Sequence, residues 1–100
     1  MLNMIEVRQT KAYAAWFVGL KDHRVRARID ARIRRLSLGN PGDVNPIGNG
    51  VSELRIDYGP GYRVYHVRKG AAVVLLCGGT KNGQERDIKQ ALRLAAELED

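Results

Sequence analysis

One hundred residues suffice for one small domain around a single core, and 44% apolar with 28% charged residues is typical of a folded chain. The 17 lysines and arginines exceed the 11 acidic residues, and the net charge of +6 favours a polyanionic partner: nucleic acid, an acidic protein or anionic lipid. No apolar run approaches the roughly 20 residues of a membrane span, and Cys77 has no partner for a disulfide, so we expect a cytoplasmic protein with this thiol in its core. Two histidines, one cysteine and no acidic cluster predict no metal site and no cofactor.

The chain opens with a predicted strand and two helices. Alternating side chains indicate a strand over about residues 3–8. Thr10 can cap a helix over residues 11–20, whose apolar side chains recur at spacings of three and four. Asp22 can cap a second helix, which stops at Gly39. The short joint between them predicts an antiparallel helical hairpin.

In the second half of the chain the spacing of apolar residues changes from the helical pattern to the alternation of strands. Residues 39–50 are rich in glycine and proline and are predicted to form a connector with no element of its own. Three strands follow, over residues 51–57, 62–68 and 71–77, and their short turns predict an antiparallel meander. The last strand is apolar throughout, which indicates burial on both faces.

A final helix is predicted over residues 84–97, where apolar side chains again mark one face. The predicted order is β-α-α-β-β-β-α, an α+β domain spanning residues 1–100. Alternation in the first strand of the meander turns Leu54 and Ile56 inward and Arg55 outward.

Basic side chains gather where two strands of the meander meet. Arg55 and Arg63 are predicted to lie a few ångströms apart beside the "DYGPGY" turn. Such like charges are tolerated when an anion lies between them, which predicts a phosphate site; the alternative is that Asp57 or Glu53 neutralises them. Lys81, in "GGTKNG" after the last strand, adds a third cation, although the spacing is not that of a P-loop.

Aromatic residues flank this candidate site. Tyr58 is predicted to be exposed and able to stack on a base, whereas Tyr62 falls on the opposite face from Arg63 and Tyr65 and is predicted to face the core. His66, in phase with Tyr62, is predicted to be a core or near-core residue rather than a proton carrier.

A basic ridge on the second helix is a further candidate for contact with RNA. Its members are Arg24, Arg28 and Arg35, which share one flank of the helix. The ridge is either a solvated face or a surface that contacts phosphates or an acidic partner. Arg86, at the start of the last helix, adds charge beyond Lys81.

A basic site without metal can cleave RNA, because the 2′-hydroxyl is a built-in nucleophile that needs in-line positioning and charge stabilisation. The sequence shows no obvious general base among these cations, since lysine and tyrosine ordinarily titrate near pH 10. Binding of an anion is therefore better supported than catalysis.

The segments "ELRIDYGPGYRVYH" and "VVLLCGGTKNGQERDIKQAL", with the leading strand and helical hairpin, resemble the RelE/ParE superfamily of type II toxins. More narrowly, they are similar to the HigB-like group of "addiction module killer" proteins, over about residues 4–98. The resemblance implies a compact toxin fold in which the helical hairpin packs on a small, twisted, mainly antiparallel sheet. It also implies a cognate antitoxin, a helix-turn-helix DNA-binding protein from the adjacent gene, with which the toxin can form a heterotetramer.

RelE-type toxins are ribosome-dependent mRNA endoribonucleases. The resemblance implies that Arg63 is their phosphate-stabilising arginine, that Arg55 lies near their strand-borne lysine, and that Lys81 takes the basic position after the last strand. Their C-terminal tyrosine or histidine has no clear counterpart here. Two alternatives stay open: a ParE-type toxin that poisons DNA gyrase without catalysis, and an inactive relative that only binds antitoxin.

Overall fold

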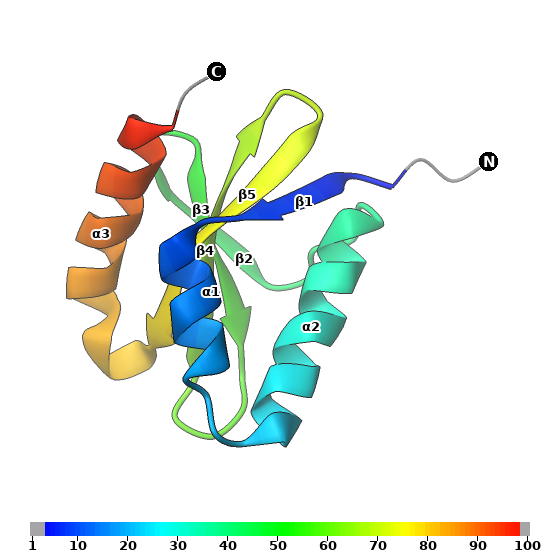
Figure 1. Ribbon diagram of the computed structural model, residues 1–100, viewed down its shortest axis with the longest axis vertical. Coiled ribbons are helices and arrows are strands. Elements are labelled where there is room, and N and C mark those ends of the chain that lie inside the picture. The colour runs from blue at the N-terminus through cyan, green and yellow to red at the C-terminus, as the bar shows by residue number, and fades with distance from the viewer. Residues whose placement is uncertain (1–3, 99–100) are drawn as a thin grey trace.

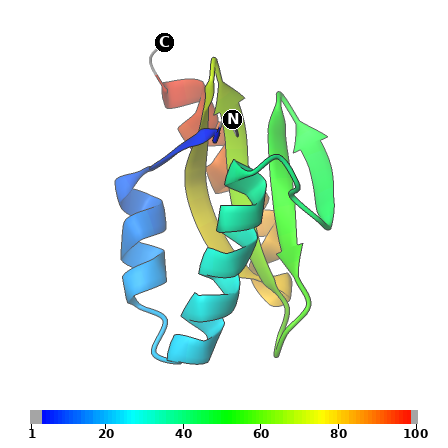
Figure 2. The same ribbon diagram turned by 90° about the vertical axis from the view of Figure 1, so that its right-hand side faces the viewer.

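The computed structural model describes residues 4–98, in which a five-stranded sheet separates two layers of helices (Figure 1, Figure 2). The strand order is β1-β5-β4-β3-β2; β1 pairs with β5 in parallel, and the other neighbouring strands are antiparallel. The predicted α+β class with a mainly antiparallel sheet is confirmed. The elements are β1 (Glu6–Gln9), α1 (Lys11–Val18), α2 (His23–Ser37), β2 (Val44–Gly48), β3 (Val51–Ile56), β4 (Tyr62–Lys69), β5 (Ala72–Thr80), the 3₁₀ turn η1 (Lys81–Gly83) and α3 (Gln84–Glu97).

The helical hairpin of α1 and α2 covers one face of the sheet (Figure 2). The predicted caps form: the Thr10 hydroxyl accepts a hydrogen bond from the Tyr13 backbone N–H at 3.0 Å, and the Asp22 carboxylate accepts one from the Arg24 N–H at 2.9 Å. Both helices contribute to one apolar cluster with the sheet. Its buried members are Tyr13, Val25, Ile29, Leu36, Leu54, Ile56, Val64, Val73 and Leu75.

Helix α3 covers the opposite face, which changes the environment of β3. The sequence predicts that β3 has an inward and an outward face, but both faces are covered, and Val51 and Glu53 are fully buried on the α3 side. Arg55, on that same side, is half-buried at the end of the strand. The buried members of this second cluster are Val51, Tyr65, Val67, Val74, Leu76, Cys77 and Ala91.

The sequence predicts no element in residues 39–50, but Val44–Gly48 forms the edge strand β2. Asn49 and Gly50 join it to β3, and both have positive φ, 53° and 80°, as a type I′ hairpin turn requires. Pro46 lacks an N–H, which an edge strand tolerates on its open side. The Asn-Gly pair was the local signal for this hairpin.

The ends of the predicted elements shift by at most three residues. The predicted start of the first strand, residue 3, lies outside the described residues. Strand β5 is buried on both faces, as predicted, and extends to Thr80. Its pairing with β4 shifts register between Tyr65 and His66, so that Leu76 and Cys77 both face α3.

Three predicted environments are observed. Cys77 is buried, and burial raises the pKa of its thiol. His66 is only 8% exposed, and burial lowers the pKa of its imidazole to about 4. Tyr62 packs against the cluster beneath the helical hairpin. In the part of the chain that the structure describes, no helix has the length and apolar character needed to cross a bilayer.

Candidate phosphate-binding site

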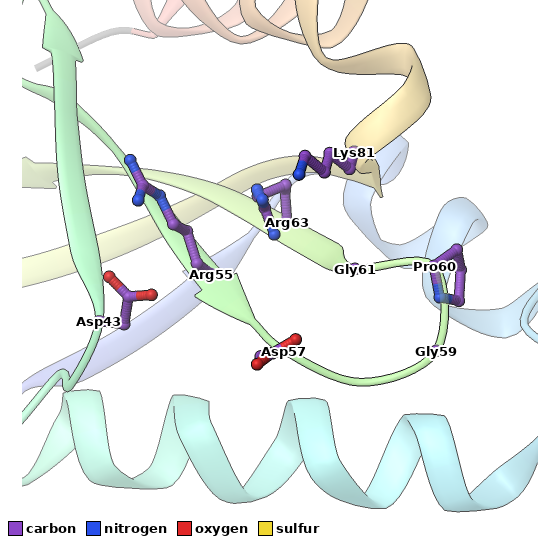
Figure 3. A pocket seen from close by; sticks show the side chains of 8 residues that line it. All are labelled: Asp43, Arg55, Asp57, Gly59, Pro60, Gly61, Arg63 and Lys81. Carbon is purple, nitrogen blue, oxygen red and sulfur yellow. The ribbon is translucent and has the colours of Figure 1, made fainter.

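A cavity of about 410 Å³ opens at the end of the sheet where β3 and β4 meet (Figure 3). Arg55 of β3 and Arg63 of β4 are directly paired in the strand register, and both line the cavity with Lys81. The structure thus brings together the three cations that the sequence placed at the site. The lining residues are Asp43, Arg55, Asp57, Gly59, Pro60, Gly61, Arg63 and Lys81.

The turn between β3 and β4 positions Lys81. The backbone N–H of Lys81 donates to the carbonyl of Gly61 at 2.9 Å, which ties the end of β5 to the turn. Gly61 has a φ of +83°, and a Cβ there would lie 3.5 Å from Lys81 Cβ and 3.6 Å from Arg63 Nη1. Glycine is therefore favoured at this position by its φ, and the turn holds Lys81 beside Arg63.

The carboxylate of Glu53 lies behind the two arginines and is completely buried. Its Oε1 accepts a hydrogen bond from Arg55 Nε at 3.0 Å and lies 4.0 Å from Arg63 Nε. Its Oε2 accepts from Gln84 Nε2 at 2.5 Å and from the Tyr65 hydroxyl at 3.4 Å. Of the two carboxylates considered from the sequence, Glu53 is the one that pairs with the arginines.

Tyr65 serves this network as a hydrogen-bond donor. Its side chain is completely buried, and burial, followed by the charge of Glu53, raises the pKa of its phenol far above the ordinary value. The phenol therefore keeps its proton at neutral pH and donates to Glu53.

Charge is unevenly arranged in the cavity. Arg55, Arg63 and Lys81 carry three positive charges against the one buried charge of Glu53. In Figure 3 their cationic ends lie along the upper side of the cavity, and Asp43 and Asp57 lie nearer α2. The arrangement suits a ligand with an anionic group at the cations and hydrogen-bond donors toward the carboxylates.

The three arginines of the basic ridge on α2 do not share one environment. Arg28 and Arg35 line a second cavity of about 280 Å³, which shares Asp57 with the first. Arg28 also lies 4.1 Å from the centre of the Tyr58 ring. Tyr58 is half-buried against the core, and Arg28 of α2 covers its ring. The prediction that Tyr58 is exposed and free to stack on a base is therefore wrong. Arg24 lines neither cavity.

Arg86 lies apart from the three cations. It lines a different cavity on α3, its side chain is 85% exposed, and its Nε lies 3.7 Å from the Asp87 carboxylate. Among the described residues, no three histidine, cysteine or acidic side chains cluster in a way that would hold a metal ion.

Two residues important to the cavity were missed in the sequence. Gln84 reaches Glu53 from the first turn of α3, across a separation of 31 residues. Arg32 Nη1 donates to the Arg55 carbonyl at 2.5 Å, and its Nη2 donates to the carbonyls of Pro41 and Asp43 at 2.9 and 3.2 Å. Neither contact has a local sequence signal, because each joins segments that only the fold brings together.

Comparison with known proteins places the chain in a family. Residues 15–98 match the family described as "Phage derived protein Gp49-like (DUF891)". An uncharacterized protein of Haemophilus influenzae is 50% identical over 95 residues, which cover 94% of this chain and 96% of that protein. The solution structure of a conserved hypothetical protein from Helicobacter pylori has a similar fold, with a TM-score of 0.53 and 18% identity, over 79% of this chain and 97% of that chain. The chain therefore belongs to the Gp49-like (DUF891) family, a toxin–antitoxin toxin family of the RelE/HigB type.

Proposed function

We propose that this protein is the toxin of a type II toxin–antitoxin pair and that it arrests growth by cleaving mRNA on the ribosome, in the cytoplasm. The family supports the toxin role. The observation that supports cleavage of RNA is the convergence of Arg55, Arg63 and Lys81 on one cavity large enough for a nucleotide phosphate and its sugar.

In this proposal the three cations hold the scissile phosphate. The 2′-hydroxyl of the preceding ribose attacks the phosphorus, and negative charge grows on the phosphorane oxygens in the transition state. Glu53 holds Arg55 by a hydrogen bond and attracts Arg63, so that little reorganisation of these side chains is needed as the charge develops. Arg28 and Arg35, in the adjoining cavity, contact the next phosphates along the strand.

The proposed partners follow from the family and the charge. The antitoxin is proposed to be a helix-turn-helix DNA-binding protein from the adjacent gene that neutralises the toxin, and the two chains to assemble as a heterotetramer. The ribosome supplies a polyanionic surface for a chain of net charge +6.

The test is an Arg63→Ala variant expressed in growing cells and added to purified translating ribosomes. We expect the intact protein to stop growth and to produce new mRNA 5′ ends inside translated codons, and Arg63→Ala to lower the cleavage rate about 10²- to 10³-fold. Arg68→Ala is the matched control, because Arg68 lies on the same strand but is exposed and outside the cavity.

Other outcomes point to other functions. Full toxicity of Arg63→Ala at equal expression would contradict the proposed site. Double-strand DNA breaks and altered supercoiling without mRNA cleavage would indicate a gyrase poison. No growth arrest by the intact protein, with tight antitoxin binding, would indicate an inactive relative.

A further inference from the structure

Cleavage through the 2′-hydroxyl needs a group that accepts its proton. Most titratable groups near the cavity are buried, already hydrogen-bonded or directed into another cavity. Glu53 is completely buried and already accepts hydrogen bonds from three side chains. Tyr65 is buried beside Glu53, and its raised pKa keeps the phenol protonated at neutral pH. His66 lines a separate cavity under the helical hairpin. The carboxylates of Asp43 and Asp57 remain.

Asp43 lines the cavity of the three cations but not the adjoining cavity on α2, and it lies close to Arg32. Burial lowers the pKa of the Arg32 guanidinium, and the charge of Asp43 acts on it in the opposite direction, which places the two charged groups within electrostatic reach. The Asp43 backbone is also held, because its carbonyl accepts from the Arg55 N–H at 2.9 Å and from Arg32 at 3.2 Å. Asp43 thus belongs to the contact that fastens β2 and α2 to β3.

Asp57 is free. It follows the last residue of β3, its side chain is exposed, and within residues 4–98 its carboxylate makes no hydrogen bond or ion pair. It lines both the cavity of the three cations and the adjoining cavity of α2. A strand that passes from one cavity to the other therefore has to pass this carboxylate.

We propose that Asp57 is the general base of the cleavage reaction; this rests on the proposed function. Its carboxylate takes the proton of the 2′-hydroxyl as the 2′-oxygen forms a bond to phosphorus. The bond from phosphorus to the 5′-oxygen then breaks, and the 5′-oxygen takes a proton from the Lys81 ammonium. The products are a 2′,3′-cyclic phosphate and a 5′-hydroxyl, and solvent returns the proton from Asp57 to Lys81.

The surroundings of Asp57 favour this role. A positioned carboxylate contributes as a general base when it lies within hydrogen-bond reach of the proton it removes, and Asp57 lines the same cavity as the cations that would hold the phosphate. The charged groups that face Asp57 are Arg55 on β3, Arg63 on β4, Lys81 on η1, Asp43 before β2, and Arg28, Arg32 and Arg35 on α2.

The test compares the intact protein with Asp57→Asn and Asp57→Glu in single-turnover cleavage of mRNA on translating ribosomes at neutral pH. We expect Asp57→Asn to lower the rate about 10²- to 10⁴-fold. Asp57→Glu, which keeps a carboxylate at this position, should recover part of the rate. Glu97→Gln, an exposed acid-to-amide change at the far end of α3, is the matched control.

A second measurement separates chemistry from binding. An mRNA with a 2′-deoxy sugar at the cleavage position cannot react, and Asp57→Asn should bind the ribosome–mRNA complex at least as tightly as the intact protein, because it removes a negative charge from the cavity. Full activity of Asp57→Asn together with a loss of about 10²-fold or more in Asp43→Asn would overturn the proposal. Cleavage by the intact protein with full activity of Asp57→Asn would overturn this inference alone, whereas no cleavage by the intact protein would overturn the proposed function as well.

Discussion

At the residue scale, Glu53 connects the core to the candidate site. One carboxylate oxygen faces two arginines of the cavity and the other faces Gln84 and Tyr65 inside the protein. A buried carboxylate costs free energy unless its lone pairs are occupied, and here donors from three elements occupy them. One of these hydrogen bonds fixes Arg55, and the charge of Glu53 attracts the Arg63 guanidinium across 4.0 Å.

We predict that Glu53→Gln destabilises the protein by about 1–3 kcal/mol, because the amide places N–H groups against existing donors and leaves buried polar atoms unsatisfied. The free energy of unfolding, measured with urea, checks this. Glu85→Gln is the matched control, because the Glu85 side chain is 92% exposed, and it should change stability by less than about 0.5 kcal/mol. Equal stabilities of the two variants would contradict the structural role of Glu53.

His66 predicts a pH dependence of stability. Its pKa is lowered from 6.5 to about 4 because burial disfavours the charged ring. Between these values the unfolded chain binds a proton that the folded chain does not, so the free energy of unfolding falls as the pH decreases from about 6.5 to 4. At pH 4 the titration of His66 alone lowers the free energy of unfolding by about 3 kcal/mol.

A His66→Gln variant should therefore lose less stability over this range than the intact protein, as measured by urea unfolding at several pH values. His23→Gln is the control, because His23 is the other histidine and is exposed. Parallel pH profiles for the intact protein and His66→Gln would rule out a buried neutral ring.

At the scale of elements, β5 is the strand on which both helical layers meet. Helix α1 places the Trp16 indole over Gly78, and α3 places the Asp87 carboxylate over Gly79. A Cβ at either glycine would overlap these groups. Two consecutive glycines thus allow close approach of helices from opposite faces, just before the chain reaches Lys81.

We predict that Gly78→Ala destabilises the protein by about 1–3 kcal/mol, because the added methyl forces Trp16 and α1 away from the sheet. Trp16 is the single tryptophan, so its fluorescence should shift to longer wavelength as the indole becomes more exposed. Gly19→Ala is the matched control: Gly19 has right-handed backbone angles, and its added methyl would lie 3.4 Å from its nearest neighbours. If the two variants unfold at the same urea concentration with the same emission, the packing argument fails.

At the scale of the whole molecule, the two helical layers differ in what they do for the cavity. The hairpin layer supplies Arg28, Arg32 and Arg35 beside the turn, whereas α3 supplies Gln84 beneath it. The cationic side chains of β3, β4 and η1 lie between these layers (Figure 3). The net charge of +6 is thus concentrated in part at the end of the sheet where the three cations meet.

Much of this architecture was predictable from local patterns. Helix caps at Thr10 and Asp22, the apolar periodicity and the glycine turn at Gly59–Gly61 depend on neighbouring residues, and the structure confirms them. The pairing of Arg55 with Arg63 also follows from a short hairpin. Strand β2 was missed because its proline and glycines lower strand propensity, although the Asn-Gly turn that pairs it with β3 was visible.

By itself the sequence determined the α+β class, the helical hairpin, the meander and the positions of the three cations, because each depends on contacts between residues close in the chain. Only the tertiary structure decided that α3 covers the outer face of β3, that Glu53 is buried there with Gln84, and that Asp57 borders two basic cavities. These relations depend on which distant segments the sheet order and the packing of the helices bring together, and no local pattern specifies that order.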